Sequence, residues 1–243
     1  ARGFDSLGVV KISRAAADQR AGRAGRTGPG RCVRLWSKSD HRNRKEFETP
    51  EVRRVDLAEA ILFLKRLGVN EITGFRWLDQ PENERRLDAE KLLTSLGALD
   101  SGGRLMEVGK KMAALPLHPR LAALVLQGGD CLGEVLFVAA AVQGEGVFKR
   151  AGRGQKWAEF LEGEPGWGND FGAEWLAMMA AKNLDFRPRE CDGLGVLARG
   201  ARETWKNFQQ LGRLLKKRGG RIKEPDFRQR GDACARAMLI AFG

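Results

Sequence analysis

Apolar residues recur at helical spacing through most of the chain after residue 50. They fall three or four positions apart over residues 57–67, 81–96 and 108–115, the period of a helix with one buried face. Similar runs predict further helices at 120–127, 133–142, 156–162, 171–183, 191–218 and 228–242. Between 98 and 105, the turn residues Asp100-Ser-Gly-Gly separate two short extended pieces, which predicts a small hairpin. The pattern therefore predicts a mainly α protein.

The first forty residues follow a different pattern. Leu7–Ile12 and Arg31–Trp36 have the apolar character of buried strands, and an Ala-rich helix followed by a glycine-rich turn lies between them. Strand, helix, turn and strand are the closing pieces of a larger parallel-sheet domain. We expect residues 1–38 to be the remnant of such an α/β domain, and the polar residues 39–50 to be a linker.

The next elements follow the order helix, helix, hairpin, helix. This order is typical of a winged-helix domain, which we place at residues 51–115. The Pro116–Pro119 joint ends it, and residues 116–243 are expected to form a helical domain.

Charge and cysteine content limit the classes of partner and compartment. The formal net charge of +12 divides into +8 for residues 1–54, −4 for 55–198 and +8 for 199–243. This distribution favours a polyanionic partner slightly over the alternative, a surface whose basic ends serve solubility only. The four cysteines lie at least 43 residues apart, so we expect neither a disulfide framework nor a metal site, but reduced thiols in a cytoplasmic protein. The sequence predicts neither a membrane span nor a signal peptide.

The segment Gln19-Arg-Ala-Gly-Arg-Ala-Gly-Arg26 carries the strongest chemical signal. Three arginines at three-residue spacing alternate with glycines that let the backbone approach a ligand closely. A guanidinium group is a permanent cation that binds phosphate oxygens in pairs and can stabilise a phosphoryl group in transfer. The alternative is an Arg/Gly loop that contacts RNA without specificity.

This octapeptide resembles motif VI of superfamily 2 helicases, in the form found in the DEAH-box group. Residues 27–37 and 49–57 are also similar to that group, as is the stretch Leu93–Leu121. His118, between Pro-Leu and Pro-Arg, is closest to the bacterial HrpB type, which the stretches 195–203 and 237–242 also resemble. The resemblance implies a RecA-like remnant with motif VI at 1–38, a winged helix at 51–115 and a helical ratchet domain at 116–243.

The resemblance also implies roles for individual residues. Gln19 would lie near the γ-phosphate of ATP, and Arg23 and Arg26 would be the arginine fingers of the ATP site. Arg20 would hold the motif to its own domain. ATP and Mg²⁺ would be the cofactors of the full-length parent. Its partners would be single-stranded nucleic acid, with RNA favoured over DNA, and the N-terminal RecA-like domain of the same parent chain.

No phosphate loop of the form GxxxxGK[ST] and no Asp-Glu-x-His occurs in the chain. We therefore expect the isolated chain to bind no nucleotide tightly and to lack ATPase activity. The alternative from another class is a non-catalytic winged-helix module that binds nucleic acid or docks a protein.

Other candidates have a structural explanation beside the functional one. The basic loop containing Lys149, Arg150, Arg153 and Lys156 would line a strand channel or be a solvated loop. The cations between 206 and 221 are explained by the negative end of a helix. Three tryptophans at apolar helical positions are expected in the core, namely Trp77, Trp175 and Trp205.

Overall fold

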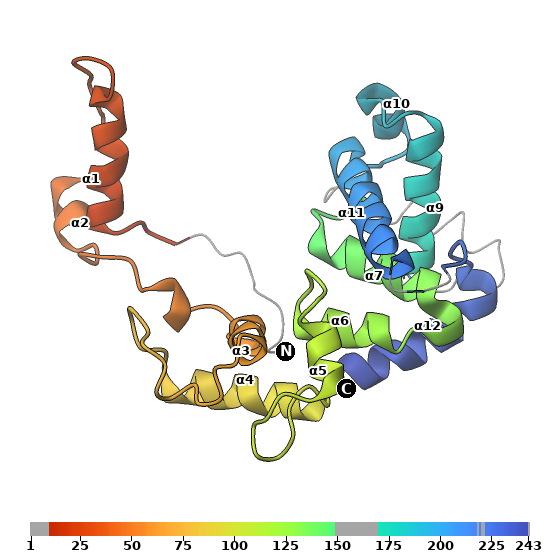
Figure 1. Cartoon of the computed structure of the whole chain (residues 1–243). Helices are drawn as coiled ribbons and strands as arrows, with labels where there is room; N and C mark the ends of the chain where they lie inside the picture. Colours follow the sequence, from red (N-terminus) through yellow and green to blue (C-terminus); the bar gives the residue numbers. More distant parts are fainter. Residues whose placement is uncertain (1–9, 149–169, 218, 220–221, 243) are drawn as a thin grey trace. The chain divides into compact units, whose positions relative to one another are not determined.

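The computed structural model describes residues 10–148, 170–217, 219 and 222–242 (Figure 1). The chain divides into two compact units, one of Ala1–Leu57 with Glu71–Glu90 and one of Ala58–Asn70 with Lys91–Gly243. The regular elements in the described ranges are all helices, and β pairing there is confined to two isolated bridges. The mainly α prediction is confirmed for this part of the chain.

The first unit is a set of short helices joined by polar loops. It holds α1 (Arg14–Gly22), the 3₁₀ turns η1 (Arg23–Gly25) and η2 (Glu51–Arg53), and α2 (Lys38–Arg42). The long helix α4 (Asn83–Ser95) begins in this unit and ends in the other. The Ala-rich helix predicted between the two strands is therefore confirmed as α1.

The predicted strand at Arg31–Trp36 is wrong. No described residue pairs with these residues as a strand, and the side chains of Val33 and Leu35 are 79% and 91% exposed. The predicted strand Leu7–Ile12 is not a strand over residues 10–12, and residues 7–9 lie outside the described ranges. An apolar extended segment becomes a strand only when a neighbouring strand satisfies its backbone, and none among the described residues does so.

The helices predicted for the winged helix are confirmed with small shifts. They are α3 (Ala58–Arg66), α4 and α5 (Glu107–Met112). The hairpin is reduced to one antiparallel bridge between Leu99 and Leu105, closed by Asp100, whose carboxylate accepts from the backbone N–H groups of Gly102 and Arg104 at 2.9 and 2.8 Å. Short polar side chains of this kind stabilise tight turns.

The second unit has its core where four helices meet. These are α7 (Leu132–Gln143), α9 (Asp170–Asn183), α11 (Ala198–Lys216) and α12 (Phe227–Phe242). Phe137 of α7 is fully buried, and Trp175, Phe208 and Phe227 meet it edge to face at centroid distances of 5.2, 6.5 and 5.9 Å. Edge-to-face pairs add to the free energy gained by burial. Helix α6 (Pro119–Leu126) packs against α7 and α12.

A buried ion pair joins α7 to the start of α12. Glu134 has no exposed surface, and its Oε1 accepts from the Asp226 N–H at 2.5 Å and from Arg230 Nε at 2.8 Å. Arg230 also donates to the Glu224 carbonyl at 2.7 Å. The carboxylate thereby satisfies a backbone donor just before α12, where helices leave N–H groups unpaired.

The single helix predicted over 191–218 is wrong, because the chain is broken there. Helix α10 (Pro188–Gly193) ends and α11 begins five residues later, after Gly195 adopts a positive φ of 71°. Between them Val196 bridges to Phe148, and the Leu197 N–H donates to the Val147 carbonyl at 2.8 Å. The helix predicted at 156–162 lies outside the described residues, as does the basic loop.

The other helix predictions in this unit are confirmed by α6, α7, α9 and α12. Trp175 is 5% exposed, as expected of a core residue, whereas Trp77 and Trp205 are only half-buried. No single helix among the described residues is long and apolar enough to cross a membrane, and the one pair that reaches that length, Pro119–Leu126 with Gly129–Gln143, is bent by 110°.

Candidate functional site

The arginine-rich segment is fixed at its base by the start of α1. The Ser13 hydroxyl accepts from the Ala16 N–H at 3.1 Å, and the Ser13 N–H donates to Glu48 at 2.7 Å. Further along, the N–H groups of Arg14 and Ala15 donate to the carbonyls of Lys45 and Glu46. All three N–H groups at this helix start are therefore satisfied by residues 45–48. The bond from Ser13 also lowers the pKa of Glu48.

Residues 19–26 keep a helical backbone throughout. Helix α1 ends at Gly22, η1 continues to Gly25, and Arg26 is still in the right-handed helical region. Because residues three or four apart lie on one side of a helix, Gln19, Arg23 and Arg26 share one side of this segment. Their side chains are exposed, and none of them bonds to a described residue. The predicted fingers are thus brought together with Gln19 on an open surface.

After Arg26 the chain turns back and passes close to the 3₁₀ turn η1. A Cβ atom on Gly30 would overlap the carbonyl oxygen of Ala24, which lies inside the 3₁₀ turn. Only glycine lets the two backbones approach this closely. The Gly28-Pro29-Gly30 sequence therefore determines where the segment after Arg26 runs.

Ion pairs hold the following segment to α1 and α2. Arg34 donates to Asp18 of α1 at 2.5 Å and contacts His41 Nε2 at 3.1 Å. In α2, Asp40 binds Lys11 at 2.6 Å and Arg44 at 2.7 Å, and these two bonds lower its pKa.

The Arg44 guanidinium also lies 4.2 Å from the centre of the Trp36 ring, a cation–π contact. Arg44 donates in addition to the Ile12 carbonyl at 3.1 Å. Residues 39–50, predicted as a linker, thus hold the arginine segment in place. Sequence reasoning missed Asp18, Arg34 and Glu48, whose partners lie 16 to 35 positions away and leave no local pattern.

The segment is chemically suited to bind an anion. It presents three guanidinium groups and one amide, and no carboxylate lies between residues 19 and 26. Such donors match the oxygens of a triphosphate, whereas Mg²⁺ is held by carboxylates, phosphates and water, and the segment contains no carboxylate. No group of three or more His, Cys, Asp or Glu within the described ranges is arranged to hold a metal ion.

His118 has a structural role as the N-cap of α6. Its Nδ1 accepts from the Arg120 N–H at 3.3 Å, with Pro119 in the first turn of the helix. His118 thus lies within the predicted Pro116–Pro119 joint and begins the helix that follows it. Arg120 in turn donates to the Ala241 carbonyl at 2.9 Å and so ties α6 to the end of α12.

Comparison with known proteins finds a match in the region around α4 and α5. Residues 89–117 match the family model of the helicase associated domain (HA2), winged-helix. They cover the end of α4, the Leu99–Leu105 bridge and α5. This stretch of the chain is therefore similar to the winged-helix part of the HA2 domain.

A second similarity extends beyond the HA2 match. Over 160 residues the chain is 38% identical to the pre-mRNA-splicing factor ATP-dependent RNA helicase prp22 of Schizosaccharomyces pombe. The match covers 65% of this chain but 14% of the yeast protein. The chain is thus similar to a helicase-associated region of a DEAH-box helicase, and spans a small part of that relative.

Proposed function

We propose that this chain acts as the C-terminal part of an ATP-dependent DEAH-box helicase that moves along single-stranded nucleic acid, RNA rather than DNA. The observation that carries the proposal is the exposed set of Gln19, Arg23 and Arg26 on one side of a helical segment that residues 30–48 hold in place. The HA2 match and the similarity to an ATP-dependent RNA helicase support it.

In this proposal the segment forms one wall of an ATP site whose other wall belongs to the N-terminal RecA-like domain of the parent. ATP, bound there with Mg²⁺, supplies the phosphoryl group that is transferred to water. Gln19 contacts the terminal phosphate, and Arg23 and Arg26 place fixed positive charge where negative charge increases during transfer. Arg20, whose charge contributes to the lowered pKa of Glu48, holds the segment to its own unit.

The finer assignments belong to the same proposal. The chain is proposed to be of the bacterial HrpB type, on the residues around His118 and the stretches 195–203 and 237–242. The parent is proposed to work in the cytoplasm, in keeping with four cysteines that form no disulfide.

The test uses the complete parent enzyme. Arg23→Ala should lower kcat for RNA-stimulated phosphate release by about a thousandfold or more, the range known for arginine fingers, with little change in single-strand affinity. Arg42→Ala is the matched control, since Arg42 is an exposed cation of the same unit that bonds to no described residue.

Equal kcat in the two variants would refute the role of Arg23. Phosphate release by the isolated 243-residue chain would contradict the expectation that it is inactive alone. If the parent has no ATPase activity but binds nucleic acid, the non-catalytic winged-helix module is the correct interpretation.

A further inference from the structure

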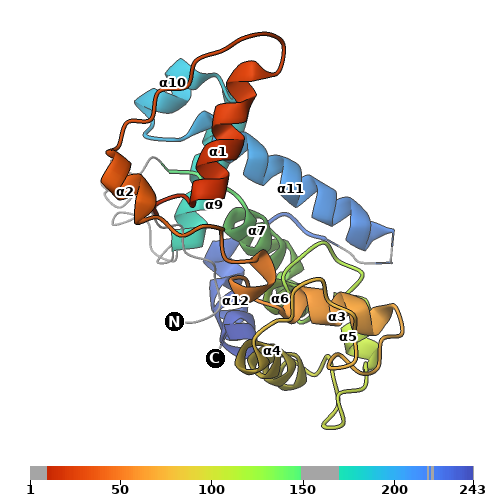
Figure 2. The same ribbon diagram turned by 90° about the vertical axis from the view of Figure 1, so that its left-hand side faces the viewer.

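One face of α11 presents cations along its whole length. The exposed positions of this helix and its C-cap fall three or four apart, as on one helical side. Two are glutamines and none is acidic; the others are Arg199, Arg202, Lys206, Arg213, Lys216 and Lys217. We call these six residues the α11 cation face. From Arg199 to Lys217 the face extends about 27 Å at 1.5 Å per residue. Figure 2 shows the course of helix α11.

The helix dipole explains only one end of this face. Cations near a helix C-terminus are stabilised, which accounts for Arg213 and Lys216 in the last turn. Arg199 and Arg202 lie near the N-terminus, where the dipole disfavours positive charge, and the first turn contains no acid to offset it. The sequence-based explanation by the helix end therefore does not extend to the whole face.

Few neighbouring groups neutralise the face. Arg199 pairs with Glu145 at 3.2 Å, and Arg202 donates to the carbonyls of Asp185 and Phe186 at 3.4 and 3.3 Å. Glu203 lies beside them on the same helix. The other four cations, from Lys206 to Lys217, form no ion pair with a described residue. An exposed row of unpaired cations is complementary to a polyanion.

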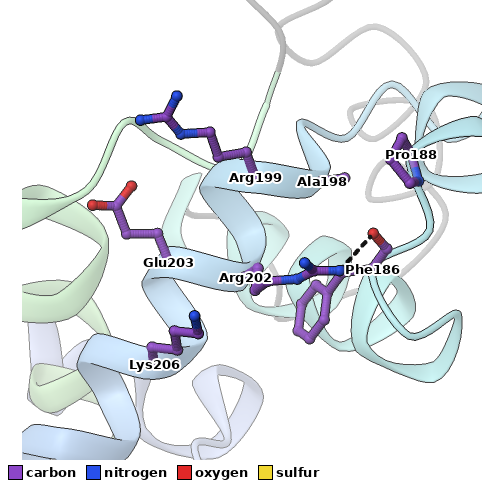
Figure 3. Close-up of a pocket in the computed structure, with 7 residues that line it drawn as sticks. All are labelled: Phe186, Pro188, Ala198, Arg199, Arg202, Glu203 and Lys206. Carbon is purple, nitrogen blue, oxygen red and sulfur yellow. Dashed lines mark hydrogen bonds between the residues drawn. The ribbon is translucent and has the colours of Figure 1, made fainter.

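At its N-terminal end the face borders a pocket of about 360 Å³ (Figure 3). Phe186 and Pro188 line one side, and residues of α11 from Ala198 to Lys206 line the other. Arg202 extends toward Phe186, whereas Arg199 extends away from it. Its charged lining consists of Arg199, Arg202 and Lys206 together with the carboxylate of Glu203, so three cations outnumber one acid around the hollow. A phosphate group there can accept hydrogen bonds from the cations.

We propose that the α11 cation face binds the phosphate backbone of a nucleic-acid duplex. Surfaces that hold single strands stack bases on exposed aromatic rings, and no exposed position of α11 is aromatic. The two aromatic residues of this helix are half-buried and contact other rings. Trp205 lies against Phe208 at 5.8 Å, and Phe208 meets Trp175 at 5.7 Å.

A row of cations and amides without aromatics is the composition that contacts backbone phosphates independently of sequence. The surface is separate from the proposed ATP site and does not depend on Arg23 or Arg26. It adds a contact for double-stranded nucleic acid to a protein proposed to move on single strands.

The experiment measures binding of the whole 243-residue chain by fluorescence anisotropy. The probes are a blunt-ended 20-base-pair RNA duplex and a 20-nucleotide oligouridine, each from 50 to 200 mM salt. The test variant Lys206→Gln/Arg213→Gln/Lys216→Gln removes three unpaired cations of the face. The control Lys91→Gln/Lys111→Gln/Arg236→Gln removes three exposed cations elsewhere, which likewise form no ion pair with a described residue.

If the three residues contact phosphates, the slope of log K against log salt for the duplex should be less steep by about 2.7 in the test variant than in the unchanged protein. Over this salt range that difference is equivalent to about 40-fold in duplex affinity. The control should leave most of the slope intact. The charge-conserving variant Lys206→Arg/Arg213→Lys/Lys216→Arg should restore it, which separates loss of charge from loss of folding.

Three results would overturn the proposal. The first is that the duplex affinities of the test and control variants depend equally on salt. A second is a loss of oligouridine binding as large as the loss of duplex binding, which would make the face a single-strand track. The third is no duplex binding at 50 mM salt; binding of polyglutamate that the test variant loses would then assign the face to an acidic protein. None of these outcomes depends on ATP hydrolysis, so failure here leaves the proposed function standing.

Discussion

The buried pair between Glu134 and Arg230 makes the second unit sensitive to a single carboxylate. In Glu134→Leu, the Asp226 N–H loses its acceptor and the Arg230 guanidinium loses its counter-charge. An unpaired buried donor costs about 1–3 kcal/mol, and breaking one side of a buried ion pair costs about 3–5 kcal/mol in all. Glu134→Gln keeps one acceptor oxygen and removes only the charge, so it should cost about 1–2 kcal/mol.

The double variant tests how much of the loss comes from leaving one charge of the pair without its partner. Glu134→Leu/Arg230→Leu removes both charges and leaves the Asp226 N–H as the main unpaired group, so it should cost about 1–3 kcal/mol, well below the sum of the single changes. Glu107→Gln is the control, because Glu107 pairs with Lys110 at 3.1 Å on an exposed surface and such pairs contribute about 0–1 kcal/mol.

The assay is urea unfolding followed by circular dichroism, with thermal melting as a second measure. Glu134→Leu should lower the melting temperature by about 6–20 °C for a chain of this size. The reasoning is refuted if Glu134→Leu changes the free energy of unfolding no more than Glu107→Gln, or if the double variant is as destabilised as the two single changes added together.

Four further results are expected. Cys32 is exposed and the other three thiols are buried, so a thiol reagent at pH 8 should modify Cys32 alone until the protein is unfolded. Burial raises the pKa of Cys234 from 9.0 to about 12. The contribution of this thiol to stability is therefore unchanged below pH 9 and decreases above it, by about 2 kcal/mol at pH 10.5. Urea titrations between pH 9 and 10.5 should show this decrease in wild type and not in Cys234→Ala. The buried Thr204 hydroxyl has no hydrogen-bond partner among the described residues, so Thr204→Val should raise stability by up to about 1 kcal/mol; a lower urea midpoint would contradict this. Gly30→Ala would force the backbone away from Ala24, and hydrogen exchange should speed up over residues 23–31 but not in α7.

Helices were predictable from sequence where one face is buried. The apolar spacing in α3, α4, α6 and α12 indicates which residues are covered, and each boundary fell within two or three positions. The break between α10 and α11 was missed, because Leu194 and Leu197 continue the apolar spacing of a helix across Gly193 and Gly195.

The segment Arg31–Trp36 shows why a strand is harder to predict than a helix. Its apolar character is a local property, but a strand exists only through hydrogen bonds to a second segment. Here polar contacts fix these residues instead, including Arg34 with Asp18 and Trp36 with Arg44.

The candidate site was predictable in part. The arginine spacing of residues 19–26 is visible in the sequence, but the residues that hold this segment are not. The uniform charge of the α11 face became evident only when exposure could be assigned to each position along the helix.

The bridge between Phe148 and Val196 has a consequence for how this region can change in evolution. After α7 the chain departs at Val147 and it returns to α11 at Leu197, and these two residues share a backbone hydrogen bond. Because departure and return are adjacent, the number of residues between them can vary without moving either end. Insertions and deletions between these two residues should therefore fall outside α9, whose Trp175 packs in the core, while α7 and α11 keep their lengths.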